Sequence, residues 1–138
     1  MPITSFQGEY RWLSNFWPAP IVDYEGIQWP SVEHAYQAAK ATNQEDKERI
    51  RNAKTPGEAK RLGKIVDHDS RFTYRRLIIM HDLVYLKFIQ DLGLQQKLLD
   101  TGEEMLIEGN YWHDNFWGQC QCQNCNIGQN HLVRFSCE

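Results

Sequence analysis

Two carboxylates of this sequence stand among large aromatic side chains, where they could act on the same bond. Glu33 follows Trp29 and precedes Tyr36, and Asp114 lies in the run N-Y-W-H-D-N-F-W-G. A carboxyl group beside bulky apolar rings is poorly solvated, which holds it ready as a general acid, while charges or donors can keep a second carboxylate ionised. This combination is typical of glycosidic bond cleavage.

The transition state of glycosidic cleavage carries positive charge on the sugar. One carboxylate can stabilise this oxocarbenium ion while another group protonates the leaving base or activates water. The reaction requires no metal and no cofactor. The sequence also lacks the G-x-G-x-x-G, P-loop, G-x-S-x-G, H-E-x-x-H and EF-hand patterns, so we expect neither nucleotide-dependent redox nor P-loop chemistry.

Each of these residues also has a purely structural explanation. Glu33 in the first turn of a helix would stabilise the helix dipole without any catalysis, and Asp114 beside Asn115 could hold a turn. Lys40 and Lys60 are by default exposed lysines of helices. Residue pattern alone therefore leaves the catalytic and the structural interpretations open.

The elements that must position Glu33 are a β region and the helix that follows it. Residues 4–27 are rich in aromatic and β-branched residues, interrupted by Pro18, Pro20 and Gly26, which predicts short strands or hairpins. The run S-V-E-H-A-Y-Q-A-A-K-A then predicts a helix with Ser31 as its N-cap. Its apolar positions are Val32, Ala35, Tyr36 and Ala39, and its other face carries Glu33, Gln37 and Lys40.

Five further helices are predicted. Q-E-D-K-E-R-I-R-N-A-K reads as a solvated helix, and a helix over residues 56–62 starts at a Thr55 capping box and ends at Gly63. Residues 72–92 predict a central core helix, residues 94–100 a helix stopped by Thr101-Gly102, and the tail from Gln129 a last helix. Between the last two of these helices, the sequence predicts a short strand over residues 105–107 and a loop over residues 110–118. The core stripe of the central helix is predicted to be Leu77, Met80, Val84 and Phe88.

Composition limits the class of protein. With 138 residues and 41% hydrophobic content, the chain fits a single domain, residues 1–138, of α+β class: predominantly helical with a small N-terminal β region. A net charge of -3 argues against a broad electrostatic grip on nucleic acid. No apolar run has the length of a membrane span or a signal peptide core, so we expect a cytoplasmic protein with no membrane contact.

The four cysteines occur within the last nineteen residues, so they cannot staple the whole fold. Thiolates of Cys120, Cys122 and Cys125 could bind a structural zinc ion, with His113, His131 or Cys137 as the fourth ligand. Free thiols and a redox role are the alternatives. A zinc ion there would stiffen the loop after Asp114 and take no part in the chemistry.

Seven short runs, in order, resemble the NADAR family, also called YbiA-like, and cover nearly the whole chain. They are F-x-G-x-Y-R-W-L-S-N-F from Phe6, Y-E-G-I-Q-W-P-S-V-E-H-A-Y-Q-A-A-K from Tyr24, T-P-G-E-A-K-R-L-G from Thr55, K-F-I-Q-D from Lys87, L-L-D-T-G from Leu98, D-N-F-W-G from Asp114 and G-Q-N-H-L from Gly128. Each run alone is weak, whereas the ordered set is specific.

The resemblance implies a mostly helical α+β fold and an N-glycosidase acting at the anomeric ribose carbon. Known family substrates are phosphorylated intermediates of riboflavin synthesis and ADP-ribosylated guanine in nucleic acid. The residues of this sequence that match the family's proposed catalytic pair are Glu33 and Asp114. Phe72 departs from the family, which commonly has Trp there, so stacking is kept while an indole N–H donor is lost.

The remaining ligand contacts are expected from chemistry. Ser14 and Asn15 could hydrogen-bond ribose hydroxyls, and Lys60 and Arg11 could meet phosphate. A flat base could stack beside Trp117 and Gly118, and the other aromatic pocket residues are expected to be Trp29, Tyr36 and Phe72.

Two other functions compete with the enzyme. The same pocket could hold ADP-ribose or a nucleotide without cleaving it, or the aromatic residues could form a stacking platform for nucleic acid. The substrate could be a free ribosyl-phosphate or ADP-ribosyl metabolite, or one attached to nucleic acid. No helix shows a sustained seam beyond its core face, which leaves the oligomeric state open.

Overall fold

The computed structural model describes residues 8–101, 109–110 and 119–120 of the chain. These residues belong to two compact units, one formed by Asn15–Gln90 and the other by Met1–Ser14 together with Asp91–Glu138. The helical content and the small antiparallel sheet near the N-terminus confirm the predicted mostly helical α+β class. The expectation of one domain over residues 1–138 stays a prediction.

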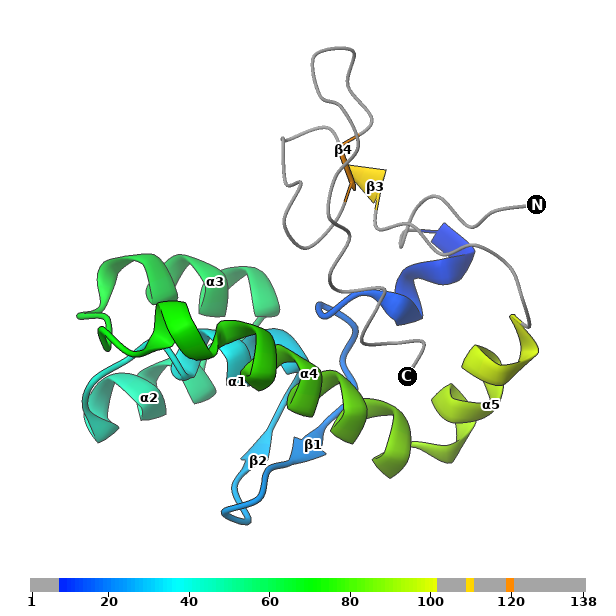
Figure 1. Cartoon of the computed structure of the whole chain (residues 1–138), viewed down its shortest axis with the longest axis horizontal. Coiled ribbons are helices and arrows are strands. Elements are labelled where there is room, and N and C mark those ends of the chain that lie inside the picture. The colour runs from blue at the N-terminus through cyan, green and yellow to red at the C-terminus, as the bar shows by residue number, and fades with distance from the viewer. Residues whose placement is uncertain (1–7, 102–108, 111–118, 121–138) are drawn as a thin grey trace. The chain divides into compact units, whose positions relative to one another are not determined.

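Helix α1 (Val32–Ala38) lies at the centre of the Asn15–Gln90 unit (Figure 1). It contacts α2 (Gln44–Arg51), α3 (Pro56–Ile65), α4 (Phe72–Gln90) and strand β2 (Gln28–Trp29). Because neighbours surround it, every residue of α1 is buried. The helix therefore carries its polar residues Glu33, His34 and Gln37 into the interior as well as its apolar ones.

Helices α1 and α3 start at the predicted caps Ser31 and Thr55, and α2 starts at Asn43, a cap that was not predicted from the sequence. The side chains of Ser31, Asn43 and Thr55 each accept a hydrogen bond from the backbone N–H three residues later, which satisfies one of the donors left open at a helix start. The predicted end of α3 at Gly63 is wrong. The helix continues to Ile65, and Gly63 is a buried interior position.

The predicted β region is much smaller than expected. Residues Gly8–Leu13 form a 3-10 helix, η1, whose Trp12 and Leu13 are buried, because a helical turn can bury aromatic residues as well as a strand can. Strands β1 (Ile21–Val22) and β2 have two residues each and pair antiparallel, with Ile21 opposite Trp29.

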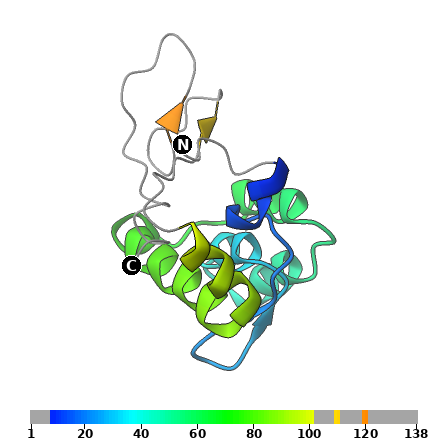
Figure 2. The ribbon, with the colours of Figure 1, turned by 90° about the vertical axis from the view of Figure 1, so that its right-hand side faces the viewer.

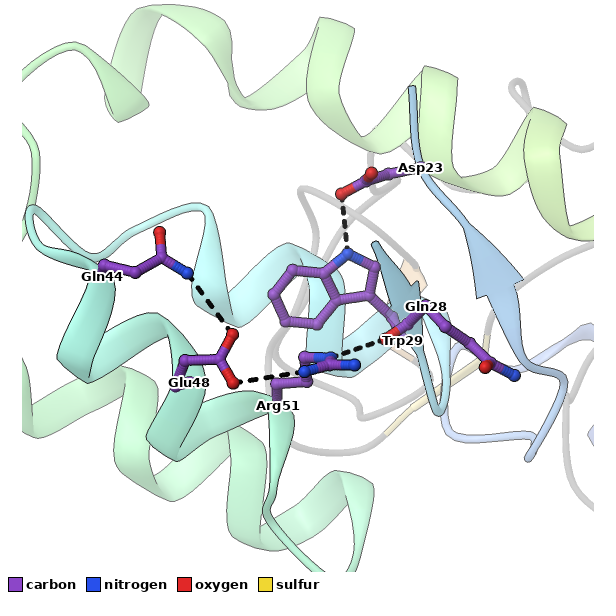
Figure 3. Close-up of polar contacts among 6 residues, drawn as sticks. All are labelled: Asp23, Gln28, Trp29, Gln44, Glu48 and Arg51. Carbon is purple, nitrogen blue, oxygen red and sulfur yellow. Dashed lines mark hydrogen bonds and ion pairs between the residues drawn. The ribbon is translucent and has the colours of Figure 1, made fainter. Parts of the chain in front are cut away.

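The hairpin between β1 and β2 is held by side chains (Figure 3). Asp23 accepts three hydrogen bonds: Oδ1 from the backbone N–H groups of Glu25 and Ile27, and Oδ2 from the Trp29 indole at 2.8 Å. Gly26 completes the turn with a φ of 82°, a conformation that glycine adopts at little cost. The turn thus fixes the indole of the buried Trp29.

Both strands are also tied to helices. The Arg51 Nε donates to the Gln28 carbonyl at 2.8 Å while its guanidinium pairs with Glu48 at 3.2 Å (Figure 3). At the end of α4, the Gln90 amide accepts from the Val22 N–H at 2.8 Å and donates to the Val22 carbonyl at 2.7 Å. The hairpin is therefore bound to α2 through β2 and to α4 through β1.

Replacing Asp23 with Ala is expected to lower the free energy of unfolding by about 1–3 kcal/mol, because three N–H groups lose their acceptor and one of them belongs to a buried indole. Urea denaturation measures the change. Glu25→Ala, which removes an exposed carboxylate from the same turn, is the matched control and should change stability by less than about 0.5 kcal/mol. Equal losses in the two variants would contradict the role given to Asp23.

The core face of α4 includes Met80, Val84 and Phe88, as predicted, and also Leu83. Leu77, predicted on the same stripe, is exposed. The helix spans Phe72–Gln90, close to the expected 72–92.

The other unit contains η1, α5 (Leu92–Asp100, with Asp91 as N-cap) and a parallel pair of two-residue strands, β3 (Gly109–Asn110) and β4 (Gln119–Cys120). The predicted strand over 105–107, most of the predicted loop over 110–118 and the predicted last helix lie outside the described residues. Among the helices that the structure describes, none is long and apolar enough to cross a membrane.

Candidate active site

Glu33 lies in the first turn of α1 and exposes only 7% of its surface. Its backbone N–H donates to the Asn15 carbonyl at 3.2 Å, and the Asn15 side chain lies 3.4 Å from the Met80 sulfur on α4. Asn15 thus joins the start of α1, at the Glu33 backbone, to the middle of α4. The poor solvation expected from the neighbouring aromatic residues is present, although its main cause is the burial of the whole helix.

The Glu33 carboxylate accepts a hydrogen bond from Gln37, one turn later on α1. The distance from Gln37 Nε2 to Glu33 Oε1 is 2.7 Å. Gln37 is 3% exposed, and its Oε1 has no hydrogen-bond partner among the described residues. A donor N–H directed at a carboxyl oxygen favours the ionised form of that group, so Gln37 both orients Glu33 and supports its negative charge.

Gly63 of α3 provides the space for Gln37. A Cβ at position 63 would overlap Gln37 Oε1 and would lie 3.0 Å from Gln37 Cδ and 3.1 Å from Gln37 Cβ, so the Gln37 side chain would have to move. The glycine inside α3 costs helix stability, and its absent side chain is what allows the amide of Gln37 to reach Glu33. Gly63 is therefore part of the site through Gln37.

His34 is a structural residue. Its Nε2 lies 3.0 Å from the Ala53 carbonyl and its Nδ1 lies 2.7 Å from the Ser31 hydroxyl. A carbonyl only accepts, so Nε2 carries the proton and Nδ1 of the neutral ring accepts from the hydroxyl. With both nitrogens occupied and 2% exposure, His34 ties α1 to the chain after α2 and is not a candidate acid or base.

Tyr36 and Phe72 form an aromatic pair at the other end of α1. Their ring centroids are 5.2 Å apart in an edge-to-face arrangement, and the Lys40 ammonium lies 5.6 Å from the Tyr36 ring and 5.8 Å from the Phe72 ring. The loop before α4 sets this position, because the Asp69 N–H donates to the Lys40 carbonyl at 2.7 Å. Aromatic faces stabilise the cation and could stack on a flat ligand.

Lys40 interacts with the buried Glu33 and with two lysines of α3. Burial lowers the pKa of Lys40 below its usual range; the negative charge of Glu33 acts in the opposite direction, and the positive charges of Lys60 and Lys64 lower the pKa further. The Lys60 ammonium lies 6.0 Å from the Phe16 ring. A buried carboxylate that interacts with Lys40, with two further ammonium groups near Lys40, suits a ligand that is anionic at one end and develops positive charge at the other.

Replacing Lys60 with Gln is expected to raise the pKa of Lys40, because it removes a positive charge that disfavours the Lys40 ammonium. NMR titration of the lysine side-chain signals measures the shift. Lys54→Gln, which removes an exposed lysine that has no effect on Lys40, should leave the Lys40 titration in place. An unchanged Lys40 titration in Lys60→Gln would show that the two ammonium groups do not interact.

The predicted site residues fall into three groups. Asn15, Trp29, Tyr36, Lys60 and Phe72 lie in the same compact unit as Glu33, and the Trp29 indole N–H is already bonded to Asp23. Arg11 and Ser14 belong to the other unit, where the Ser14 N–H donates to the Arg11 carbonyl at 3.0 Å. Outside the described residues lie Asp114, Trp117 and Gly118.

The zinc prediction is equally untested. Cys122 and Cys125 lie outside the described residues, and only the backbone of Cys120, in β4, is described. In the part of the chain that the structure describes, no group of three or more His, Cys, Asp or Glu side chains could hold a metal ion.

Two residues of the site were not recognised as functional from the sequence. Gln37 was placed on the same helix face as Glu33, and its spacing of four residues was the available signal for a hydrogen bond. Gly63 was assigned to a helix end, and no pattern in the sequence indicates its approach to Gln37.

Comparison with known proteins gives a consistent result. The NADAR domain family matches residues 4–134. The chain is 36% identical to the N-glycosidase Npun_R5314 of Nostoc punctiforme, over 89% of this chain and 79% of that protein. It is 30% identical to the N-glycosidase YbiA of Escherichia coli, over 83% of this chain and 71% of that one.

Two further relatives bear on fold and pathway. The riboflavin biosynthesis protein VVA0006 of Vibrio vulnificus is 35% identical over 79% of this chain, which spans only 30% of that longer protein. The NMR structure of E. coli YbiA superposes with a TM-score of 0.81 at 27% identity, covering 99% of this chain and 82% of that one. The fold is therefore YbiA-like.

Proposed function

The chain belongs to the NADAR domain family, and from this premise we propose that it is an N-glycosidase that hydrolyses the C–N bond at the anomeric ribose carbon of an ADP-ribosyl or ribosyl-phosphate compound. The observation that carries the proposal is the buried Glu33 carboxylate, which Gln37 orients and which lies in the field of Lys40. Relatives that bear the name N-glycosidase support the reaction class.

The proposed reaction separates charge at the sugar. As the C–N bond breaks, its electron pair leaves with the base nitrogen, and the ribose acquires oxocarbenium character. Glu33, whose ionised form the Gln37 N–H favours, stabilises this positive charge from a site with little water, where the interaction is strong. Water then adds to the anomeric carbon, one of its protons is transferred away, and the departing nitrogen receives a proton.

Asp114 is the proposed partner in proton transfer. Two carboxyl groups are sufficient for this chemistry when their surroundings give them different protonation states. Glu33 has an N–H donor and nearby ammonium groups, both of which suit a carboxylate. The complementary task, to protonate the base or accept a proton from water, is assigned to Asp114.

The charge around Glu33 supports a phosphorylated substrate. Lys60 and Lys64 on α3 and Lys40 after α1 lie close enough to influence one another, and ammonium groups are suited to phosphate oxygens. Phe72, which is half-buried and packs against the buried Tyr36, offers ring surface for a base or a ribose. A ribosyl compound with phosphate at one end and a heterocycle at the other contains both features.

Mass spectrometry of two reactions tests the proposal. The purified protein is incubated with DNA that carries ADP-ribosylated guanine and, separately, with a phosphoribosylamino-pyrimidine, and free ADP-ribose, sugar phosphate and released base are quantified. Release of ADP-ribose assigns a de-ADP-ribosylating glycosidase, and release of the pyrimidine assigns hydrolysis of a riboflavin-pathway intermediate.

The same samples distinguish the enzyme from a binding module. Calorimetric titration with ADP-ribose measures affinity without any requirement for turnover. Binding with no cleavage of either substrate would overturn the proposed hydrolysis and favour a protein that only holds the ligand.

A further inference from the structure

Helix α4 has a second apolar face that points away from the core. While Met80, Val84 and Phe88 are buried, Tyr74 is 87% exposed and Ile78 67% exposed, and Tyr85 and Ile89 are exposed as well. Successive members of this set are four, seven and four residues apart. These are helical intervals, so the four side chains lie along one side of the helix. Figures 1 and 2 show α4 on the outside of the Asn15–Gln90 unit, with α1 on its inner side.

The outer face is symmetric about its own middle. The point between His81 and Asp82 is equally distant in sequence from Tyr74 and Ile89, and from Ile78 and Tyr85. If two copies of α4 pack antiparallel around a twofold axis at this point, Tyr74 meets Ile89 of the partner subunit, and Ile78 meets the partner's Tyr85. A closed homodimer requires this kind of self-complementary surface.

The charges on the same face fit the same arrangement. At the axis, His81 of each copy faces the partner's Asp82, which places an imidazole N–H donor opposite a carboxylate twice. Within one copy the His81 Nδ1 to Asp82 Oδ1 distance is 3.6 Å, and both side chains are partly exposed. A donor opposite a carboxylate at the axis favours antiparallel pairing of identical helices, whereas two carboxylates facing each other would oppose it.

The ends of the helix are complementary as well. Arg75 lies in the first turn of α4, and its charge acts on the Asp69 carboxylate just before the helix. In an antiparallel pair Arg75 also lies beside the C-terminal turn of the partner's α4, where the helix dipole is negative. The partner thus adds a favourable interaction for this arginine.

We propose that the protein forms a homodimer through antiparallel packing of its α4 helices, with the twofold axis between His81 and Asp82. Burial of eight large side chains would remove roughly 1,000 Å² of surface from water, at the low end for specific interfaces. The dimer should therefore be weak and should form and dissociate with concentration.

Sedimentation velocity of the full chain tests the proposal across micromolar to millimolar concentrations. The wild-type mass should rise from 16.3 kDa toward twice that value. Ile78→Glu places two carboxylates in the apolar interface and should weaken association roughly tenfold or more. Ile65→Glu is the matched control, since Ile65 of α3 is 70% exposed but lies off this face, and it should associate as the wild type does.

Charge exchange at the axis tests the orientation. His81→Asp alone brings two carboxylates together across the axis, and Asp82→Lys alone removes the carboxylate that faces the partner's His81, so each should weaken association. The double variant places Asp opposite Lys and should restore the dimer. A monomeric wild type throughout the concentration range, equal losses in Ile78→Glu and Ile65→Glu, or no recovery in the double variant would overturn the proposal.

Discussion

Glu33→Gln should lower kcat by about 10³-fold, with little change in KM, on whichever of the two ribosyl substrates the wild type cleaves. The substitution keeps the size and the hydrogen-bonding oxygen of the side chain, so Gln37 can still donate to it. The negative charge is lost, and with it the stabilisation of the oxocarbenium ion that forms only in the transition state. The ground-state complex keeps its phosphate contacts, which is why affinity should persist.

The matched control is Glu45→Gln. Glu45 occupies the first turn of α2, as Glu33 does of α1, but it is exposed. Both changes remove a favourable charge from a helix start, so any effect on helix stability is shared. Steady-state kinetics together with ADP-ribose titration separates the roles. If Glu33→Gln kept more than about a tenth of the wild-type kcat, Glu33 would be a structural residue and the proposed mechanism would fail.

The second large effect is expected at Gly63, which contacts no substrate in the proposed reaction. Gly63→Ala introduces a Cβ that would overlap Gln37 Oε1, so the Gln37 amide must move and Glu33 loses its orienting donor. We expect kcat to fall about 100-fold, the size of effect that a misplaced catalytic group produces. The free energy of unfolding should fall by about 1–3 kcal/mol through overpacking.

Two companion variants isolate the cause. Gly57→Ala lies in the same helix, where a Cβ meets only Thr55 Oγ1 at 3.9 Å, and it should leave kcat unchanged. In a Gln37→Ala background the additional Gly63→Ala change should cost less than it does in the wild type, because the amide is absent and only the 3.1 Å contact with the Cβ of residue 37 remains. A double-mutant cycle measures this coupling; additive losses would mean that Gly63 acts by another route.

The local features of the site were predictable, and the contacts between elements were not. Ser31 marked the start of α1, and the position of Glu33 in its first turn followed from that cap. The burial of Glu33 depends on α2, α3 and α4 packing around α1, and helical periodicity alone does not reveal how many sides of a helix are covered.

Two mistaken predictions have the same origin. Glycine commonly ends a helix, so the sequence predicts the end of α3 at Gly63. In the structure, the missing side chain of Gly63 instead leaves space for Gln37, where α1 packs against α3. Aromatic residues favour strands, which made residues 8–13 read as part of a β region, although Trp12 and Leu13 are buried from a 3-10 helix. In both cases tertiary packing overrides local preference.

The side-chain hydrogen bonds that tie the β1–β2 hairpin to α2 and α4 affect how the chain behaves in a crowded solution. A two-stranded sheet presents open edges, which are templates onto which another chain can add a strand. Here the edge of β1 at Val22 is occupied by the Gln90 amide, and the Gln28 carbonyl on β2 is occupied by Arg51. Side chains thus take the hydrogen bonds that a foreign strand would need, and this hairpin is protected from edge-to-edge aggregation.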